Sequence, residues 1–239
     1  MLRKCSIAAA FLWAVAAFAQ DPGDHPPPYR GVNTIVDGVF VTPVPGVPFS
    51  AVVKIESTQV LPDGTSATRK SIATIARDSR GRIYNERRQL MPSTFTGTPQ
   101  ILSSHIFDPE TRLSTFLNPY TRMARQMTIP QREATASAPE HPFLKQQDLG
   151  TETMENFAVH GTSRSRTIPA AASGTAKDLV VTDEYWYSDE LHMNMLTRHE
   201  DARTGLQVLT ITGVNRSEPD PAMFQVPPGY KVVDENPPN

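Results

Sequence analysis

Six histidines are the residues of this sequence best suited to acid–base or metal chemistry. They are His25, His105, His141, His160, His192 and His199. No two of them stand four residues apart, as the histidines of a helical metal site do. The string from His192 to Met195, His-Met-Asn-Met, contains soft copper ligands. Along a strand, however, alternate side chains point to opposite faces, so this set does not converge. We expect no metal and no cofactor.

Spacing also gives no support to nucleophilic or acid–base catalysis. The segment from Gly161 to Ser165, Gly-Thr-Ser-Arg-Ser, begins like a nucleophile elbow, but serine stands where the second glycine belongs. The acidic pairs Asp183-Glu184, Asp189-Glu190 and Glu200-Asp201 consist of adjacent residues, which point apart on a strand, and two of the pairs lie in expected turns. We predict no catalytic residues and a protein that is not an enzyme.

The charges are nearly balanced, with 23 basic and 25 acidic residues, but they are unevenly distributed. Residues 69–88 hold seven basic and two acidic side chains. Such a stretch can bind a polyanion, but arginines on the solvent face of a sheet also serve solubility alone. We therefore expect no nucleic-acid partner.

The first nineteen residues have the pattern of an export signal. Arg3 and Lys4 precede an apolar run over residues 6–16, and Ala17-Phe-Ala19 is an A-x-A cleavage signal. We predict cleavage near Ala19 and a periplasmic or secreted product. Cys5 is the only cysteine and lies within the signal, so the mature chain would have neither a disulfide nor a thiol site. No later apolar run reaches the roughly 20 residues of a membrane-spanning helix, so we expect that the protein is not an integral membrane protein.

Short alternating segments separated by turn residues fill most of the remaining chain. Residues 20–48 are rich in proline, which favours an extended lead-in. The expected strands are 51–61, 66–77, 82–90, 100–107, 112–117, 121–129, 180–188, 191–198 and 206–214. Between them we expect a strand pair over 147–167 around Gly161, a flexible link at 169–174 and, as an option, a short helix within 143–149.

This rhythm predicts a mainly β protein. Turn signals such as Pro62-Asp-Gly64 and Asp201–Gly205 join strands directly, and no crossover helices separate them. We predict a single antiparallel curved sheet over residues 49–233, with few short helices, followed by a tail at 234–239.

Several strands carry apolar residues on both faces. Leu206 and Val208 must point one way, and Leu209 the other. This is compatible with a closed sandwich or with a curved sheet whose concave face is apolar, and we favour the second arrangement. Trp186, Phe107 and Phe116 are the residues predicted to line the apolar groove. Trp186 fits a core anchor first and the floor of the groove second.

The C-terminal stretch 219–230 is predicted to act as a clamp. Its prolines fix an extended path. Along this path Phe224, Val226 and Tyr230 are expected to anchor one side against the sheet.

The chain resembles a family of uncharacterised exported bacterial proteins, abundant among acidobacteria, which share the half-barrel plan of LolA-like lipoprotein carriers. The resemblance covers nearly all of residues 49–233. Among the segments that carry it are Asp78-Ser-Arg-Gly-Arg82, Glu184-Tyr-Trp-Tyr-Ser188 and the ending Phe-x-x-Pro-x-Gly-Tyr from Phe224 to Tyr230. It implies a half-barrel sheet and, as a ligand, a lipid or lipoprotein acyl chain.

Two functions are compatible with these observations. The first is a non-enzymatic binding module that holds an acyl chain or an apolar partner segment on the concave face. The second is a structural or protein-interaction domain of the cell envelope, with a filled core and no ligand. A carrier exposes apolar side chains in a cavity, whereas an interaction domain buries them. The expected partners are accordingly a lipid or lipoprotein acyl chain, or an envelope protein.

Overall fold

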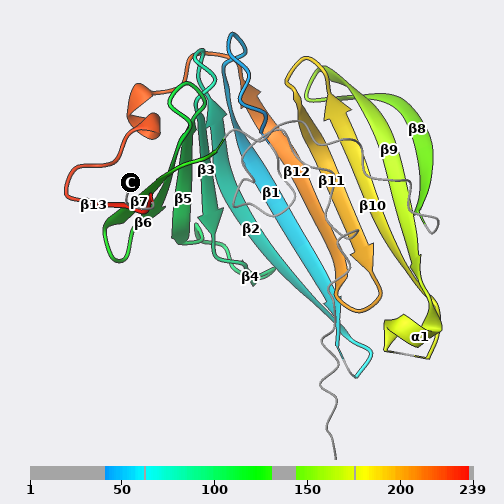
Figure 1. Cartoon of the computed structure of the whole chain (residues 1–239). Helices are drawn as coiled ribbons and strands as arrows, with labels where there is room; N and C mark the ends of the chain where they lie inside the picture. The colour runs from blue at the N-terminus through cyan, green and yellow to red at the C-terminus, as the bar shows by residue number, and fades with distance from the viewer. Residues whose placement is uncertain (1–40, 62, 131–143, 175, 237–239) are drawn as a thin grey trace, which may run out of the picture.

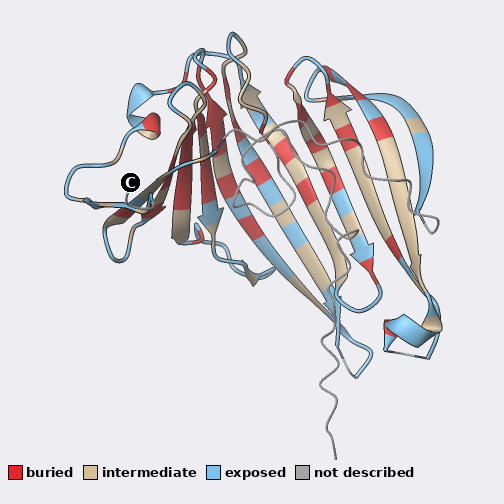
Figure 2. Ribbon diagram, in the orientation of Figure 1, coloured by how far each residue is buried: buried red, intermediate tan, exposed pale blue. Residues whose placement is uncertain are grey.

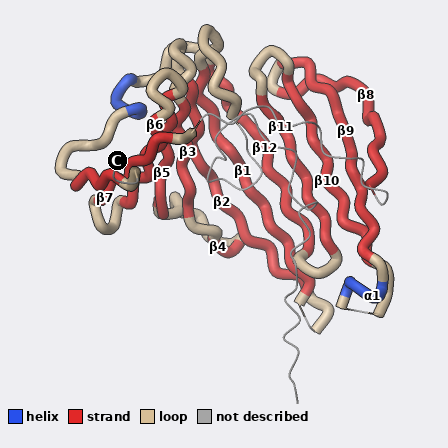
Figure 3. Tube along the Cα trace, in the orientation of Figure 1, coloured by secondary structure: helices blue, strands red, loops and turns tan. Residues whose placement is uncertain are grey.

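The computed structural model describes residues 41–61, 63–130, 144–174 and 176–236 (Figure 1). The predicted signal at 1–19, the lead-in up to residue 40 and the end of the tail at 237–239 lie outside the described residues. Strands make up most of the described part, which confirms the predicted mainly β class (Figure 3). No helix within the described ranges is both long and apolar enough to cross a membrane.

The elements follow one another along the chain with short connections. The strands are β1 (Phe49–Val60), β2 (Ser66–Arg77), β3 (Ile83–Arg88), β4 (Met91–Pro92), β5 (Ile101–Asp108), β6 (Leu113–Asn118), β7 (Met123–Thr128), β8 (Leu144–Met154), β9 (Phe157–Ile168), β10 (Leu179–Ser188), β11 (Met193–Asp201), β12 (Gly205–Asn215) and β13 (Lys231–Asp234). Two short helical turns are α1 (Ala170–Ser173) and η1 (Pro221–Phe224), the latter a 3-10 helix.

All of these strands belong to one open, curved sheet, as predicted (Figure 1). Its order is β13-β7-β6-β5-β3-β2-β1-β12-β11-β10-β9-β8, and β4 pairs with β2 beside this path. Most neighbours are consecutive hairpins, but β1 pairs with β12 at the centre of the sheet. The described pairs are antiparallel except for β13, which runs parallel to β7.

Two local predictions between residues 143 and 167 are wrong. Residues 144–149, where a short helix was an option, belong to strand β8. Pairing with β9 satisfies their backbone hydrogen bonds, whereas so short a helix would be only marginally stable. The turn expected around Gly161 lies instead at Glu155 and Asn156, whose φ angles are 50° and 68°. The link at 169–174 contains the helical turn α1, which its alanines favour.

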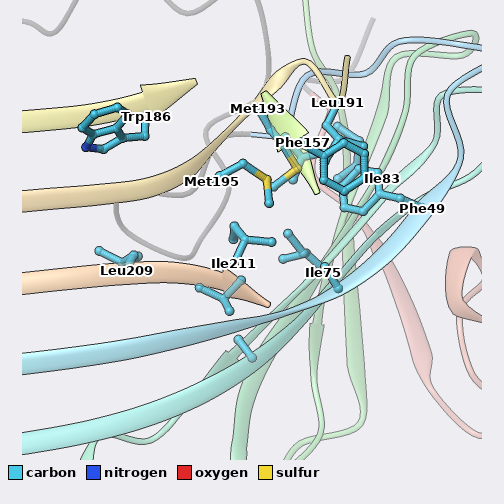
Figure 4. Packing of buried hydrophobic residues seen from close by; sticks show 14 of the residues in the cluster. Phe49, Ile75, Ile83, Phe157, Trp186, Leu191, Met193, Met195, Leu209 and Ile211 are labelled. Carbon is cyan, nitrogen blue, oxygen red and sulfur yellow. The ribbon is translucent and has the colours of Figure 1, made fainter. Parts of the chain in front are cut away.

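A buried apolar cluster lies on each face of the sheet, as β2 shows. Ile75 belongs to the first cluster and Ala76 to the second, and adjacent strand residues point to opposite faces. The first cluster (Figure 4) comprises Val41, Phe49, Ala51, Val53, Ala73, Ile75, Ile83, Phe107, Phe157, Val159, Trp186, Leu191, Met193, Met195, Leu209 and Ile211. The second comprises Ala76, Ile106, Leu117, Ala124 and Phe224, with Tyr84, Met223, Val226 and Tyr230 packed against it. Burial is densest on β3, β5 and β6, whereas β8 is almost entirely exposed (Figure 2).

Arg77 ties the start of the described chain to the sheet. Its side chain is fully buried, and its guanidinium donates hydrogen bonds to the carbonyl oxygens of Thr42, Val47 and Leu191 at 2.7–2.9 Å. The same group lies 5.0 Å from the centre of the Phe49 ring. Burial lowers the pKa of Arg77 to about 10, so the guanidinium remains protonated at neutral pH. One cation therefore links residues 42–49, β2 and the turn before β11.

Candidate functional site: a cavity beneath the C-terminal segment

The three residues predicted to line an apolar groove do not form one group. Trp186 on β10 and Phe107 on β5 both belong to the first cluster, and each is 7% exposed. Six strand-to-strand steps separate β5 from β10. At about 4.8 Å per step this is roughly 29 Å along the sheet. Phe116 on β6 lies outside the cluster and stacks on His105, with 4.5 Å between ring centroids. The groove stays a prediction, with its residues at separate places on the sheet.

Trp186 is fixed by its immediate neighbours. Its indole Nε1 donates a hydrogen bond of 2.6 Å to Glu184 Oε1. The ring lies over Gly161 on the neighbouring strand, where a Cβ atom would be 2.8 Å from two ring carbons and 2.9 Å from Leu149 Cβ. A side chain at position 161 would therefore collide with the indole. This arrangement supports the core-anchor interpretation of Trp186.

A buried polar pair lies beside Phe107. Asn85 and His105 are cross-strand partners on β3 and β5, and neither is exposed. His105 Nε2 is 2.8 Å from Ser114 Oγ, whereas His105 Nδ1 and both polar atoms of the Asn85 amide have no hydrogen-bond partner among the described residues. Burial lowers the pKa of the His105 imidazole to about 4. This pair is therefore uncharged at neutral pH.

The predicted clamp residues, in contrast, do share one site. Phe224, Val226 and Tyr230 all pack on the second cluster, on the face opposite the first. Figure 1 shows this C-terminal segment alongside β5, β6 and β7. The path is not extended throughout as expected, because Pro221–Phe224 form η1.

Both ends of the C-terminal segment are anchored. At its start, the Asp220 carboxylate accepts a hydrogen bond from the Ala222 N–H at 2.9 Å, which caps η1. The Arg82 guanidinium lies 5.0 Å from the centre of the Phe224 ring and also pairs with Asp78. At its end, β13 is hydrogen-bonded along β7. The segment between these anchors is thus held across the face of the sheet.

A cavity of about 220 Å³ lies between this segment and the sheet. From the sheet it is lined by Tyr84, Ile101, Ser104, Leu117 and Pro119, and from the C-terminal segment by Ala222, Met223, Gln225, Pro227 and Tyr230. Most of this lining is apolar. The cavity is larger than the roughly 150 Å³ engineered cavity that binds benzene, and smaller than the roughly 300–1,000 Å³ of sites for whole small molecules. Its size suits one ring or one large side chain.

Tyr84 and Ser104 form a polar wall of the cavity and belong to a chain of hydrogen bonds that continues to Glu86 and Arg88. Tyr84 Oη donates to Glu86 Oε1 at 3.0 Å and lies 3.3 Å from Ser104 Oγ. The other carboxylate oxygen, Glu86 Oε2, accepts from Arg88 Nε at 2.8 Å and from the Thr74 N–H at 3.1 Å. Glu86 is 7% exposed, so its charge is compensated by Arg88 largely out of water. Burial, with the nearby Glu86 carboxylate, raises the pKa of Tyr84 to about 12.

These groups are suited to binding rather than to bond making. A serine nucleophile needs a base that accepts its proton. The only described side chain bonded to Ser104 is Tyr84, whose own proton is directed at Glu86. In the ranges that the structure describes, no three histidine, cysteine or acidic side chains are grouped to hold a metal ion. The cavity therefore offers shape, apolar surface and one polar wall.

Comparison with known proteins finds similar structures but no similar sequence. No family model matches the sequence, and no curated protein matches it. An uncharacterised conserved protein from Thermus thermophilus is similar over 80% of this chain and 91% of its own, with a TM-score of 0.44 and 10% identity. The structure of the Pseudomonas aeruginosa MucA/MucB complex matches over 78% of this chain and 58% of its own, with a TM-score of 0.41 and 11% identity.

A LolA superfamily protein from Nitrosomonas europaea is also among the similar structures. It matches over 76% of this chain and 91% of its own, with a TM-score of 0.32 and 12% identity. This is the superfamily whose half-barrel plan the sequence resembles. At such identities we take the function from this chain's own residues.

Most of the cavity was not foreseen from the sequence. Tyr230 was predicted as a clamp residue, but Tyr84, Ser104 and Leu117 were not singled out. The alternation of Tyr84 and Glu86 on β3 was a weak signal, because it puts both side chains on one face. Nothing in the spacing linked this pair to the C-terminal segment about 140 residues later.

Proposed function

We propose that this protein is a non-enzymatic binding module that holds one apolar side chain of a partner segment in the cavity beneath its C-terminal segment. The proposal rests on the cavity of about 220 Å³ between the sheet and the C-terminal segment, which is lined mostly by apolar side chains. A concave apolar site with a few polar groups is the usual form of a binding pocket.

The dimensions favour a partner segment over a whole acyl chain. A lipid carrier must bury most of a long chain, which needs a larger volume than one ring-sized space. A partner polypeptide needs only one anchoring side chain in the cavity, while the rest of the segment lies outside. The exposed residues Gln225 and Pro227 at the cavity offer it further contact surface.

The opposite face of the sheet fits the filled-core alternative. Val53, Leu209 and Ile211 of the first cluster are at most 2% exposed. An open acyl groove would leave such side chains accessible. We therefore propose a filled core on this face and a binding site on the other.

We also propose that the protein acts in the periplasm or after secretion. The charged start, apolar run and A-x-A triplet of residues 1–19 support this location. An exported or envelope-associated protein is then the expected source of the partner segment.

Toluene provides a direct test of the cavity. An NMR titration of the mature protein should show saturable shifts of amides that line the cavity, such as Ser104 and Met223. Ala222→Trp should abolish them, because Ala222 lines the cavity and a large ring there fills it. Ala158→Trp is the matched control, since Ala158 is an exposed residue of β9, far along the sheet. Unsaturable or scattered shifts in the wild type would refute the proposal.

A further inference from the structure

The polar wall of the cavity presents a hydrogen-bond acceptor without a spare proton. Tyr84 has a single hydroxyl proton, which is donated to Glu86 Oε1. At the 3.3 Å contact between Tyr84 and Ser104, the Ser104 hydroxyl must then be the donor. The protons are thus ordered from Ser104 to Tyr84 to Glu86, and the order is fixed by a carboxylate that can only accept.

Ser104 lines the cavity, and its Oγ has unused lone pairs. Ser104 is 6% exposed and lines the cavity, and among the described residues only Tyr84 bonds to its hydroxyl. An occupant that displaces water from the cavity must therefore supply a donor to this oxygen. Gln225 and Tyr230, the other polar side chains of the lining, are partly or fully exposed and can bond to water.

We propose that the cavity selects a side chain that combines a ring with an O–H group, namely a tyrosine of a partner polypeptide. This inference rests on the proposed function and names its ligand. The volume accommodates a ring, and the apolar lining from Leu117 and Met223 suits its faces. The phenolic O–H would donate to Ser104 Oγ. A ring that ends in an acceptor would place its lone pairs opposite those of Ser104 Oγ. No hydrogen bond would form, and the Ser104 oxygen would remain without a donor.

The occupant belongs to a polypeptide rather than to a free phenol. A single ring by itself binds only weakly, because its few contacts must offset the freedom lost on binding. Pro119, Gln225 and Pro227 extend the surface beyond the cavity, where the backbone of a partner would lie. Tyrosine is also among the side chains that dominate binding energy at protein interfaces.

The test compares p-cresol with 4-methylanisole, which has the same ring but no O–H donor. NMR titration of the wild type should give p-cresol at least about tenfold tighter binding, the effect expected for one unsatisfied buried acceptor. In Ser104→Ala the two affinities should agree within about twofold. In Tyr84→Phe the Ser104 proton is released, so 4-methylanisole should gain affinity. Ser104→Ala removes only one oxygen, and its circular dichroism spectrum checks that it folds.

Each outcome separates this inference from the proposed function. Equal affinities in the wild type, or a preference for 4-methylanisole, would overturn the tyrosine assignment while toluene binding would still support the cavity. Failure of all three probes would overturn both. An acetylated and amidated Gly-Tyr-Gly peptide should bind tighter than p-cresol. If p-cresol binds tighter than the peptide, the occupant is a small phenol and the polypeptide assignment is wrong.

Discussion

Acid should destabilise this protein through His105, a histidine of β5 with no exposed surface. Its imidazole has Ser114 as its one described hydrogen-bond partner, and burial lowers its pKa from 6.5 to about 4. The charged residues nearest to it on the same face, Arg87 on β3 and Arg125 on β7, are exposed and positive. Arg125 is paired with Glu235. No described carboxylate therefore stabilises the protonated imidazole.

The sign and size of the effect follow from proton linkage. In the unfolded chain His105 regains a pKa near 6.5. Between pH 6.5 and 4 the unfolded state binds this proton and the folded state does not, so the free energy of unfolding falls as the pH falls. A pKa difference of about 2.5, at about 1.4 kcal/mol per pH unit, gives a loss of about 3 kcal/mol at pH 4. The contribution is fully present above pH 6.5.

Urea unfolding at pH values from 7.5 to 4 would measure this loss. Carboxylates also titrate in this range, so the informative quantity is the difference between wild type and His105→Gln, which keeps a donor for Ser114. We expect this difference to shift by about 3 kcal/mol in favour of the variant between pH 7.5 and 4. Parallel pH profiles for wild type and His105→Gln would refute the reasoning.

Three further outcomes are expected. Phe224→Ala should lower the free energy of unfolding by about 3–5 kcal/mol, because Phe224 is 6% exposed in the second cluster; a loss under about 1 kcal/mol in urea melts would show that the C-terminal segment is loosely held. Gly161→Ala should cost about 1–3 kcal/mol and alter the emission of Trp186, since the new methyl group meets the indole; an unchanged spectrum and stability would contradict this packing. Intact-mass analysis of exported protein should find a chain that begins at Gln20, and a species that retains Cys5 would contradict the predicted cleavage.

The strand rhythm of this fold could be predicted from local sequence. Turns with Pro-Asp-Gly at 62–64 and Asp201–Gly205 are indicated by residue type, and the strands on either side of them alternate as expected. The turn at Glu155 and Asn156 was missed because no glycine marks it. Glycine is typical of turns, but at position 161 its lack of a side chain leaves room for the Trp186 ring.

Long-range pairing set the limit of what could be foreseen. The composition of β1 and β12 does not reveal that they are neighbours, because many strand pairs satisfy the same alternation. The cavity depends on the same kind of information, since it joins Ser104 to residues near Tyr230. The clamp residues could be predicted, because they are apolar and lie between prolines. The part of the sheet that they cover could not be predicted.

The central ladder between β1 and β12 has a consequence for how the chain reaches this structure. β1 can pair with β2 as soon as both have been synthesised, because only a short turn separates them. Its other edge must wait for Gly205–Asn215, near the end of the chain. Contacts of such large sequence separation slow folding, and an unpaired strand edge is a template for association with other chains. Until Gly205–Asn215 have been synthesised, that edge of β1 has no strand partner and is open to association with other chains.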